Sequence, residues 1–182
     1  MSDAPVPLTA HYVWMARYNA WFNARLYEAA AGLSDDERKR DRGAFFGSIH
    51  GTLNHLLLGD KLWLGRFAKL GTDLTMLDDT VLSLPPFTGL NMQLYDDFAA
   101  MQGHRVRVDA AIEAFSLWLT PQRVSQTLTY TTSTGLARSH PAWEALSHFF
   151  NHQTHHRGQV TTLLMQAGVD PGTTDLLALL NP

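Results

Sequence analysis

Four segments of this chain repeat apolar residues at alternating spacings of three and four, the pattern of one buried face of an α-helix. The segments extend over residues 8–33, 46–70, 94–119 and 142–167. Helix-ending residues follow three of them (Gly71, Pro121, Gly168), and Pro141 precedes the last at a position that suits a helix start. Because helices of this length bury their apolar faces against one another, the sequence predicts an all-α four-helix bundle.

The connection between the second and third helices is long. Residues 71–89 include Pro85, Pro86 and Gly89 and are interpreted as a loop. A connection of this length lets the second and third helices run parallel, which predicts a bundle with a long crossover connection rather than simple up-and-down topology.

Two shorter elements are expected outside the four helices. Residues 124–136 are rich in Thr, Ser and Gly, and Val124, Leu128 and Tyr130 are compatible with a short hairpin between the third and fourth helices. Residues 175–180 are compatible with one last helical turn. The length of the chain favours a single domain over residues 1–182.

Cysteine content and net charge exclude several classes of function. The 182 residues contain no cysteine, which rules out disulfides, thiolate metal sites and cysteine nucleophiles. The net charge of −3 argues against a sequence-independent nucleic-acid partner. Residues 1–5 carry no signal-peptide pattern, and no apolar run is long enough to span a membrane. These features predict a cytoplasmic protein with no membrane and no nucleic-acid partner.

Each apolar stripe is interrupted near its middle by a polar residue. The interruptions are Asn19, Asp60, Arg105 and the pair Gln153 and His156. The middles of four packed helices lie at one level, so these side chains are expected to meet, and burying them unpaired would cost several kcal/mol. They indicate either a polar site or a network that only fixes helix register, and Arg105 can also extend outward to solvent.

The fourth segment carries a cluster of four histidines, His148, His152, His155 and His156. Residues four apart lie on one face of a helix, and on the helical wheel His152 and His156 face the apolar side. His148 and His155 lie further towards the polar side. Two inward histidines at this spacing supply half of a transition-metal site, although a lone core histidine more often only packs and hydrogen-bonds.

A third ligand has to come from another helix, and the residues alone leave its identity open. The second segment offers His55, which lies at the right level, and Asp60, which lies in the apolar seam. His11, His50 and His104 are further candidates, of which His11 and His50 lie nearer helix ends.

Several motifs together resemble a known family. Residues 48–64 read SIHGTLNHLLLGDKLWL, and residues 152–159 read HQTHHRGQ. With residues 18–23 (YNAWFN) and 168–172 (GVDPG), these blocks resemble the DinB-like, or YfiT-like, family of metal-dependent enzymes. The resemblance covers essentially the whole chain.

The resemblance implies a three-histidine metal site in a four-helix bundle. Carried over by position, the ligands are His55, His152 and His156. Three neutral imidazoles suit Zn²⁺, Ni²⁺ or Fe²⁺ and leave a coordination position open. The resemblance further implies a homodimer and chemistry on a small molecule, in particular a low-molecular-weight thiol, by S-transfer. Hydrolysis by an activated water is a related expectation.

Further roles are expected for the other polar residues of the stripes. Ligating histidines usually donate their second N–H to another group, and Asp60 and Gln159 are the candidates for that role. Arg105 is a candidate to hold an anionic part of a substrate, and Asn19 to orient a polar part.

An enzyme is not the sole reading of these residues. The alternative is a non-catalytic module, in which the metal stabilises a dimeric bundle or the protein binds a small molecule in a stress response. An open coordination position beside a cavity favours the enzyme. A closed four-ligand site, with His148, His155 or Asp60 as the fourth ligand, favours the alternative.

Overall fold

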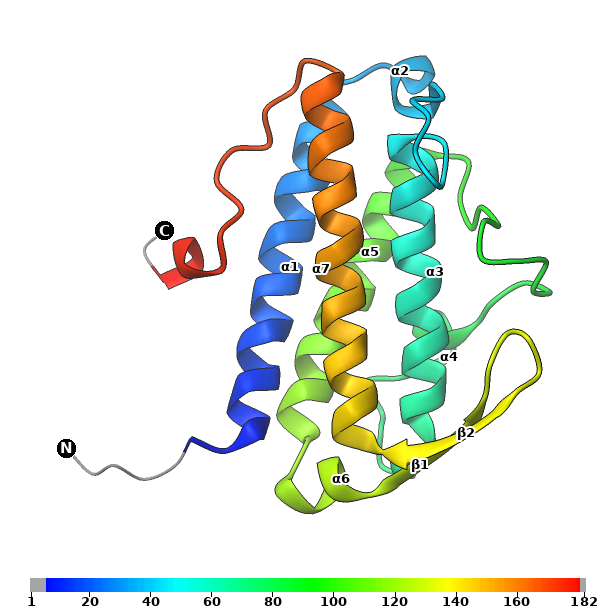
Figure 1. Ribbon diagram of the computed structural model, residues 1–182, viewed down its shortest axis with the longest axis vertical. Helices are drawn as coiled ribbons and strands as arrows, with labels where there is room; N and C mark the ends of the chain where they lie inside the picture. The colour runs from blue at the N-terminus through cyan, green and yellow to red at the C-terminus, as the bar shows by residue number, and fades with distance from the viewer. Residues whose placement is uncertain (1–5, 181–182) are drawn as a thin grey trace.

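The four striped segments form the four long helices of the molecule, in a computed structural model that describes residues 6–180. The helices are α1 (Leu8–Ala31), α3 (Ile49–Phe67), α5 (Phe98–Trp118) and α7 (Ala142–Gln166). Figure 1 shows them side by side with a small two-stranded sheet at one end. The prediction of a mainly helical chain is confirmed. The sequence predicts no signal peptide from the pattern of residues 1–5. These residues lie outside those that the structure describes.

Side chains and turn residues set the ends of these helices. The Ser48 and Asp97 side chains accept hydrogen bonds from the backbone N–H groups of Gly51 and Ala100, which caps the first turns of α3 and α5. Gly168 ends α7 with a φ of 79°, a left-handed conformation that a glycine adopts without strain.

The four long helices enclose one apolar core. Helix α1 packs against α5 and α7, and α3 packs against the same two helices. In Figure 1 the chain runs in one direction along α3 and α5 and in the opposite direction along α1 and α7, so α3 and α5 are parallel, as the length of their connection predicts. The middles of all four long helices lie at one level, and this brings together the polar residues that interrupt the stripes.

The connection between α3 and α5 is tied to α3 by polar side chains. The Asn54 carboxamide oxygen accepts hydrogen bonds from the backbone N–H groups of Leu94 and Tyr95, at 2.8 and 3.0 Å. The His50 side chain contacts the Tyr95 carbonyl oxygen at 2.8 Å. These contacts hold residues 94–97 outside the helix, so α5 begins at Phe98 rather than at the predicted Leu94. A short helix, α4 (Asp79–Leu82), lies within the connection.

The predicted hairpin is present but begins later in the chain. Strand β1 (Thr127–Thr131) pairs antiparallel with β2 (Ala137–Pro141), with Thr127 opposite Pro141 and Thr131 opposite Ala137. Val124 was wrongly assigned to it, because Thr120 caps a short helix, α6 (Pro121–Ser125), that contains this residue. The remaining elements are α2 (Asp35–Lys39) and the 3₁₀ helices η1 (Ala68–Leu70) and η2 (Leu176–Leu180). Among the described residues, no helix is long and apolar enough to cross a membrane.

Candidate metal centre

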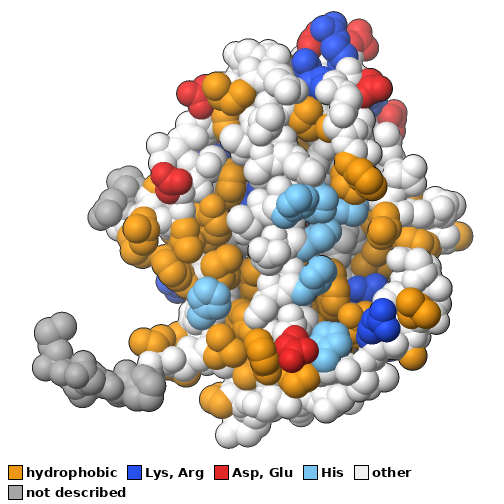
Figure 2. Space-filling view, viewed as in Figure 1, with side chains coloured by type: hydrophobic (Ala, Val, Ile, Leu, Met, Phe, Trp, Pro, Cys, Tyr) orange, Lys and Arg blue, Asp and Glu red, His pale blue; other side chains and the backbone are white. Residues whose placement is uncertain are grey.

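Three histidines from two helices converge on one point. His55 lies on α3, and His152 and His156 lie one turn apart on α7. The Nε2 atom of His55 lies 3.3 Å from that of His152 and 3.2 Å from that of His156. One nitrogen from each ring lies within 4.8 Å of both others. Figure 2 shows histidine side chains gathered on this side of the molecule, over α7 and α3.

A glycine and a phenylalanine allow this convergence. A Cβ atom at Gly59 would lie 2.9 Å from Cε1 of His152, closer than packed carbon atoms come. Gly59 therefore lets the His152 ring lie directly against α3. On the other side, the Phe46 ring stacks on the His55 ring with 3.7 Å between centroids, which fixes the plane of that imidazole.

Hydrogen bonds from the outer ring nitrogens point the inner nitrogens at one another. Nδ1 of His55 donates to the Leu90 carbonyl oxygen at 2.8 Å, and Nδ1 of His156 donates to Oε1 of Gln159 at 2.7 Å. A proton on Nδ1 leaves a lone pair on Nε2, which is the arrangement that metal-ligating histidines require. Gln159 thus lies where the sequence predicts a group that orients a ligand. Nδ1 of His152 is buried and has no hydrogen-bond partner among residues 6–180.

Burial keeps these imidazoles neutral. It lowers the pKa of His152 to about 3, with the neighbouring histidines contributing, and lowers the pKa of His156 to about 4. Burial also lowers the pKa of His55, although the hydrogen bond to Leu90 partly opposes it. Three neutral rings at pH 7 direct their lone pairs at a common point, an arrangement that a cation stabilises.

Two nitrogen–nitrogen distances within the cluster fit a first-row transition metal. Tetrahedral ligands at the usual metal–nitrogen distance of about 2.0–2.1 Å lie about 3.3–3.4 Å from one another. The His55 nitrogen lies 3.3 and 3.2 Å from its two neighbours. The donor set and its dimensions therefore suit Zn²⁺, Ni²⁺ or Fe²⁺, and three protein ligands leave one position free.

The free side of the cluster opens into a cavity of about 350 Å³. Its inner wall is formed by His55, Gly59 and His152. Its other walls come from α3, the long connection, the hairpin and the start of α7 and comprise Leu62, Trp63, Arg66, Leu90, Tyr130, Thr132, Ser133 and His148. Of the three cluster histidines, His55 and His152 line this cavity, so a small molecule in it lies beside two of the three rings.

The residues considered as a fourth ligand do not close the site. The His148 ring lies on the cavity wall, with its centroid 5.9 Å from that of His152, and is outside the convergent cluster. His155 is exposed, and its Nε2 atom lies 3.3 Å from the Gln159 amide nitrogen. Both Asp60 oxygens are engaged elsewhere. Among the described residues, the cluster therefore has three histidines and no fourth protein ligand, which is the open arrangement rather than the closed one.

Asp60, Arg105 and Asn19 do not line the histidine cavity, which corrects the roles expected for them. The Arg105 guanidinium donates to Oδ2 of Asp60 at 2.6 Å, and the Gln153 amide donates to Oδ1 at 2.9 Å. Asp60 therefore makes no hydrogen bond to a ligand histidine among the described residues and acts on His55 only through space, where its charge raises the histidine pKa. Arg105 is paired by carboxylates rather than held free for a substrate.

These residues form a buried polar network that the sequence only partly indicated. Arg105 also lies 2.9 Å from Asp109, which accepts hydrogen bonds from the Asn19 and Asn23 amides at 2.8 and 2.9 Å. The Arg157 guanidinium donates to the side-chain oxygen Oδ1 of Asn19. Two arginines thus balance two aspartates, and all of these side chains are buried. Burial alone would lower the pKa of Arg105, but Asp109 and Asp60 together raise it above its ordinary value.

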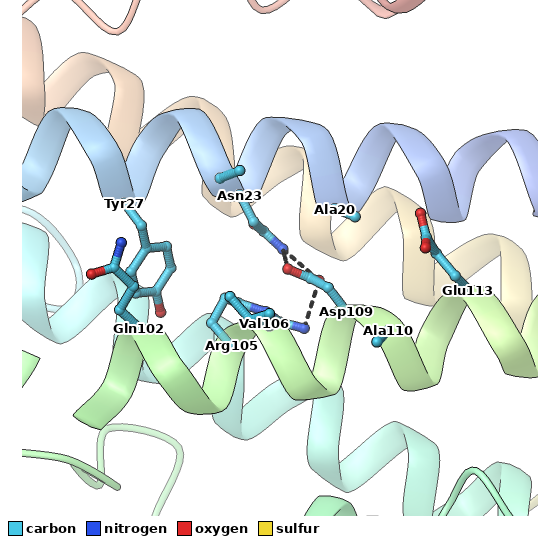
Figure 3. Close-up of a pocket in the computed structure, with 10 residues that line it drawn as sticks. Ala20, Asn23, Tyr27, Gln102, Arg105, Val106, Asp109, Ala110 and Glu113 are labelled. Atoms are coloured by element: carbon cyan, nitrogen blue, oxygen red, sulfur yellow. Dashed lines mark hydrogen bonds and ion pairs between the residues drawn. The ribbon is translucent and has the colours of Figure 1, made fainter. Parts of the chain in front are cut away.

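The network reaches the surface on the face opposite the histidines. A second cavity, of about 340 Å³, lies between α1 and α5, and Asn23, Arg105 and Asp109 form part of its wall. Figure 3 shows these residues between the two helices, with dashed lines joining Asp109 to Asn23 and Arg105. Within residues 6–180, no histidine lines this cavity. The metal-binding side chains and the charged network thus occupy different sides of the same core.

Arg66, Trp63 and Tyr130 are cavity residues that the sequence reasoning missed. The Arg66 guanidinium lies over the Trp63 and Tyr130 rings, 4.4 and 4.7 Å from their centroids. Trp63 and Arg66 follow Gly59 on α3 at helical spacing, but α3 is apolar almost all round, so this spacing did not identify a cavity wall. Tyr130 reaches the site through the hairpin, which no local pattern connects to α3.

Comparison with known proteins agrees with these observations. The model of the DinB family matches residues 8–182. Protein DinB of Bacillus subtilis (strain 168) is 26% identical over 159 residues, which cover 87% of this chain and 87% of that protein. No solved structure matches the chain. The family match extends over all four long helices and the three convergent histidines, and the chain therefore belongs to the DinB family.

Proposed function

We propose that this protein is a metal-dependent enzyme that acts on a small molecule. His55, His152 and His156 would hold one divalent ion of Zn, Ni or Fe. The proposed chemistry is S-transfer that involves a low-molecular-weight thiol, or hydrolysis at the same open position. The four long helices, with α3 and α5 parallel, support a four-helix bundle with a long crossover as the scaffold of this site.

One observation carries the proposal: three neutral imidazoles converge beside an open cavity. The nitrogen distances of 3.2 and 3.3 Å match a tetrahedral ion, and the cavity of about 350 Å³ is large enough for a small substrate. Catalytic metal sites keep a free position, whereas structural sites are closed by a fourth protein ligand. A bound ion would supply Lewis acidity, which stabilises a thiolate or lowers the pKa of water to about 7.

The chain's own residues would bind and orient the substrate. The chain has no cysteine, so the sulfur in an S-transfer reaction would arrive with the substrate. His148 lines the cavity, and partial burial, together with the Arg66 charge, lowers its pKa. Its imidazole is therefore neutral at pH 7 and can accept a proton from a thiol or water.

A purely structural metal is disfavoured by the buried network. The network already connects all four long helices without the three histidines, because Asn19, Asp60, Arg105 and Gln153 come from α1, α3, α5 and α7. A metal that tied α3 to α7 would add little to this scaffold. If the metal were purely structural, the protein would instead unfold when the metal is removed.

Metal content tests the proposal directly. Tag-free protein should contain about one Zn, Ni or Fe ion per chain by elemental analysis. The double variant His152→Ala/His156→Ala should contain none and fail to bind the ion on titration. His155→Ala is the matched control, since this exposed histidine of α7 lies outside the cluster, and it should retain the ion. Metal-free wild-type protein that also fails to bind added ions would refute the proposal.

We also propose that the protein is a homodimer through the outer face of α5. Val106 and Leu117 lie on one face of this helix and are 65% and 70% exposed, with Ala110 between them. Exposed apolar side chains along a helix are typical of an interface, and a two-fold axis would pair the face with itself. Sedimentation should give a dimer for the wild type and a monomer for Val106→Glu. Met165→Glu, which alters an exposed residue of α7, should remain dimeric.

A further inference from the structure

The histidine cavity has a second polar end, formed by Arg66. We propose that Arg66 binds a carboxylate of the substrate, so that the preferred substrate is a small organic acid whose reactive group, a thiol or an electrophilic centre, lies at the histidines. This inference rests on the proposed function and specifies its substrate class.

Arg66 is a half-buried cation without an anion. Within residues 6–180, its side chain has no ion pair and no hydrogen bond, whereas Arg105, on the other side of the core, lies between two carboxylates. Burial lowers the pKa of Arg66 below its ordinary value, which reflects the cost of removing its charge from water. A guanidinium in this position is stabilised by an anionic group that enters the cavity.

Two aromatic rings hold the guanidinium from one side. Trp63 and Tyr130 lie 4.4 and 4.7 Å from it and contact each other edge-on, with 5.3 Å between their centroids, and both rings are themselves held. Trp63 packs against Phe67 and His148, and the Tyr130 hydroxyl contacts Nε2 of His140 at 3.2 Å. Because the two rings meet on one side of the guanidinium, they do not enclose its N–H groups. An arginine held in this way presents a fork that suits the two oxygens of a carboxylate.

The position of Arg66 on α3 sets the length of the substrate. Arg66 follows His55 by eleven residues, a rise of about 16 Å along the helix. Its side chain leans back towards the start of α3, because it lies over Trp63, three residues earlier. The guanidinium therefore lies on the order of 10 Å from the histidine nitrogens.

The cavity wall between the two ends is largely apolar. Leu62, Trp63 and Leu90 line it, and the hydroxyl groups of Thr132 and Ser133 lie on the hairpin side. A substrate that fits this cavity carries its carboxylate at one end, an apolar spacer of several carbon atoms, and its reactive group at the other end. A short acid cannot reach both Arg66 and the histidines.

Thiol binding to the Co²⁺-loaded protein tests this assignment. Thiolate binding to Co²⁺ produces a charge-transfer absorption that can be titrated without any turnover. The probes are mercaptohexanoate, mercaptohexanol of matched length, and the shorter mercaptopropionate. Mercaptohexanoate should bind about tenfold more tightly than the alcohol, as expected for a partly exposed charge-assisted hydrogen bond. Mercaptopropionate should lose most of this advantage.

Variants at position 66 separate a charge effect from a general loss of structure. Arg66→Met should weaken mercaptohexanoate binding to the level of mercaptohexanol and leave the alcohol unchanged, which also shows that the variant is folded. Arg66→Lys should retain part of the preference, since it keeps the charge but not the planar fork. Equal affinity for acid and alcohol in the wild type would overturn the role of Arg66 alone. No absorption band with any thiol would overturn S-transfer as the proposed chemistry, together with the thiol acid inferred here as its substrate.

Discussion

Arg105 and Arg66 show how the same side chain serves two different regions of this protein. Arg105 is buried between Asp60 and Asp109, and its charge is balanced by a network that joins all four long helices. Arg66 lies against two aromatic rings, with no carboxylate partner among residues 6–180, in the cavity that His55 and His152 line. The comparison indicates that paired charges hold the scaffold together, while an unpaired cation marks the cavity where we propose that a substrate binds.

The largest expected difference between the two regions is in stability. Arg105→Met removes the cation that pairs directly with both Asp60 and Asp109, so it should lower the free energy of unfolding by about 3–5 kcal/mol. Arg66→Met removes a cation that has no ionic partner and should lower it by less than about 1 kcal/mol. Urea unfolding of the metal-free proteins measures both. Equal losses of unfolding free energy for the two variants would show that Arg66 also stabilises the fold. The proposed difference between the two arginines would then be wrong.

Two glutamines on α7 should divide in the same way, with a smaller effect. Gln159 accepts a hydrogen bond from Nδ1 of His156, so Gln159→Leu should weaken metal affinity about 10–100-fold and leave stability nearly unchanged. Gln153 donates to buried Asp60, so Gln153→Leu should cost about 1–3 kcal/mol of stability and leave metal affinity within a fewfold of the wild type. Competition with a chelator gives the affinities. If Gln153→Leu weakened metal affinity and Gln159→Leu lowered stability, the assignment of Gln159 to the metal cluster and Gln153 to the buried network would be wrong.

The sequence predicted the scaffold well because helical periodicity is a local property. The stripes located all four long helices, but the starts of α3 and α5 were placed too early, at Phe46 and Leu94 instead of Ile49 and Phe98. For α5 the reason is that Asn54, on another helix, binds the backbone of residues 94 and 95. The predicted hairpin began too early in the chain for a related reason. Thr120 caps a short helix there, and strand β2 has no buried residue and no alternating pattern that a sequence can reveal.

The candidate site was predictable only in part. The spacing of His152 and His156 places both rings on one face of a helix, and this follows from the residues alone. The choice between His55 and Asp60 did not follow, because α3 is buried on almost every side and offers no polar face to orient it. The family resemblance made that choice. The roles of Arg66 and Asp109 depend on side chains from other elements, which a helical wheel does not record.

The smallest expected effect is in the pH dependence of the metal-free protein. An ordinary histidine has a pKa near 6.5, but burial lowers the pKa of His152 to about 3 and of His156 to about 4. As the pH falls from about 6.5 towards 4, the unfolded chain takes up protons that the folded protein resists, so these two residues make the free energy of unfolding fall.

The double variant His152→Ala/His156→Ala should therefore lose stability less steeply over this range. All other titrating groups are common to both proteins, so the difference between the two slopes isolates the pair. Added metal should steepen the slope of the wild type alone, because the ion binds only the deprotonated, folded cluster and protons displace it. Urea unfolding at several pH values measures all three slopes. Identical slopes for the two metal-free proteins would mean that the His152 and His156 rings are hydrated in solution and keep an ordinary pKa. The histidine region would then not contain the buried, neutral imidazoles that distinguish it from the charged network.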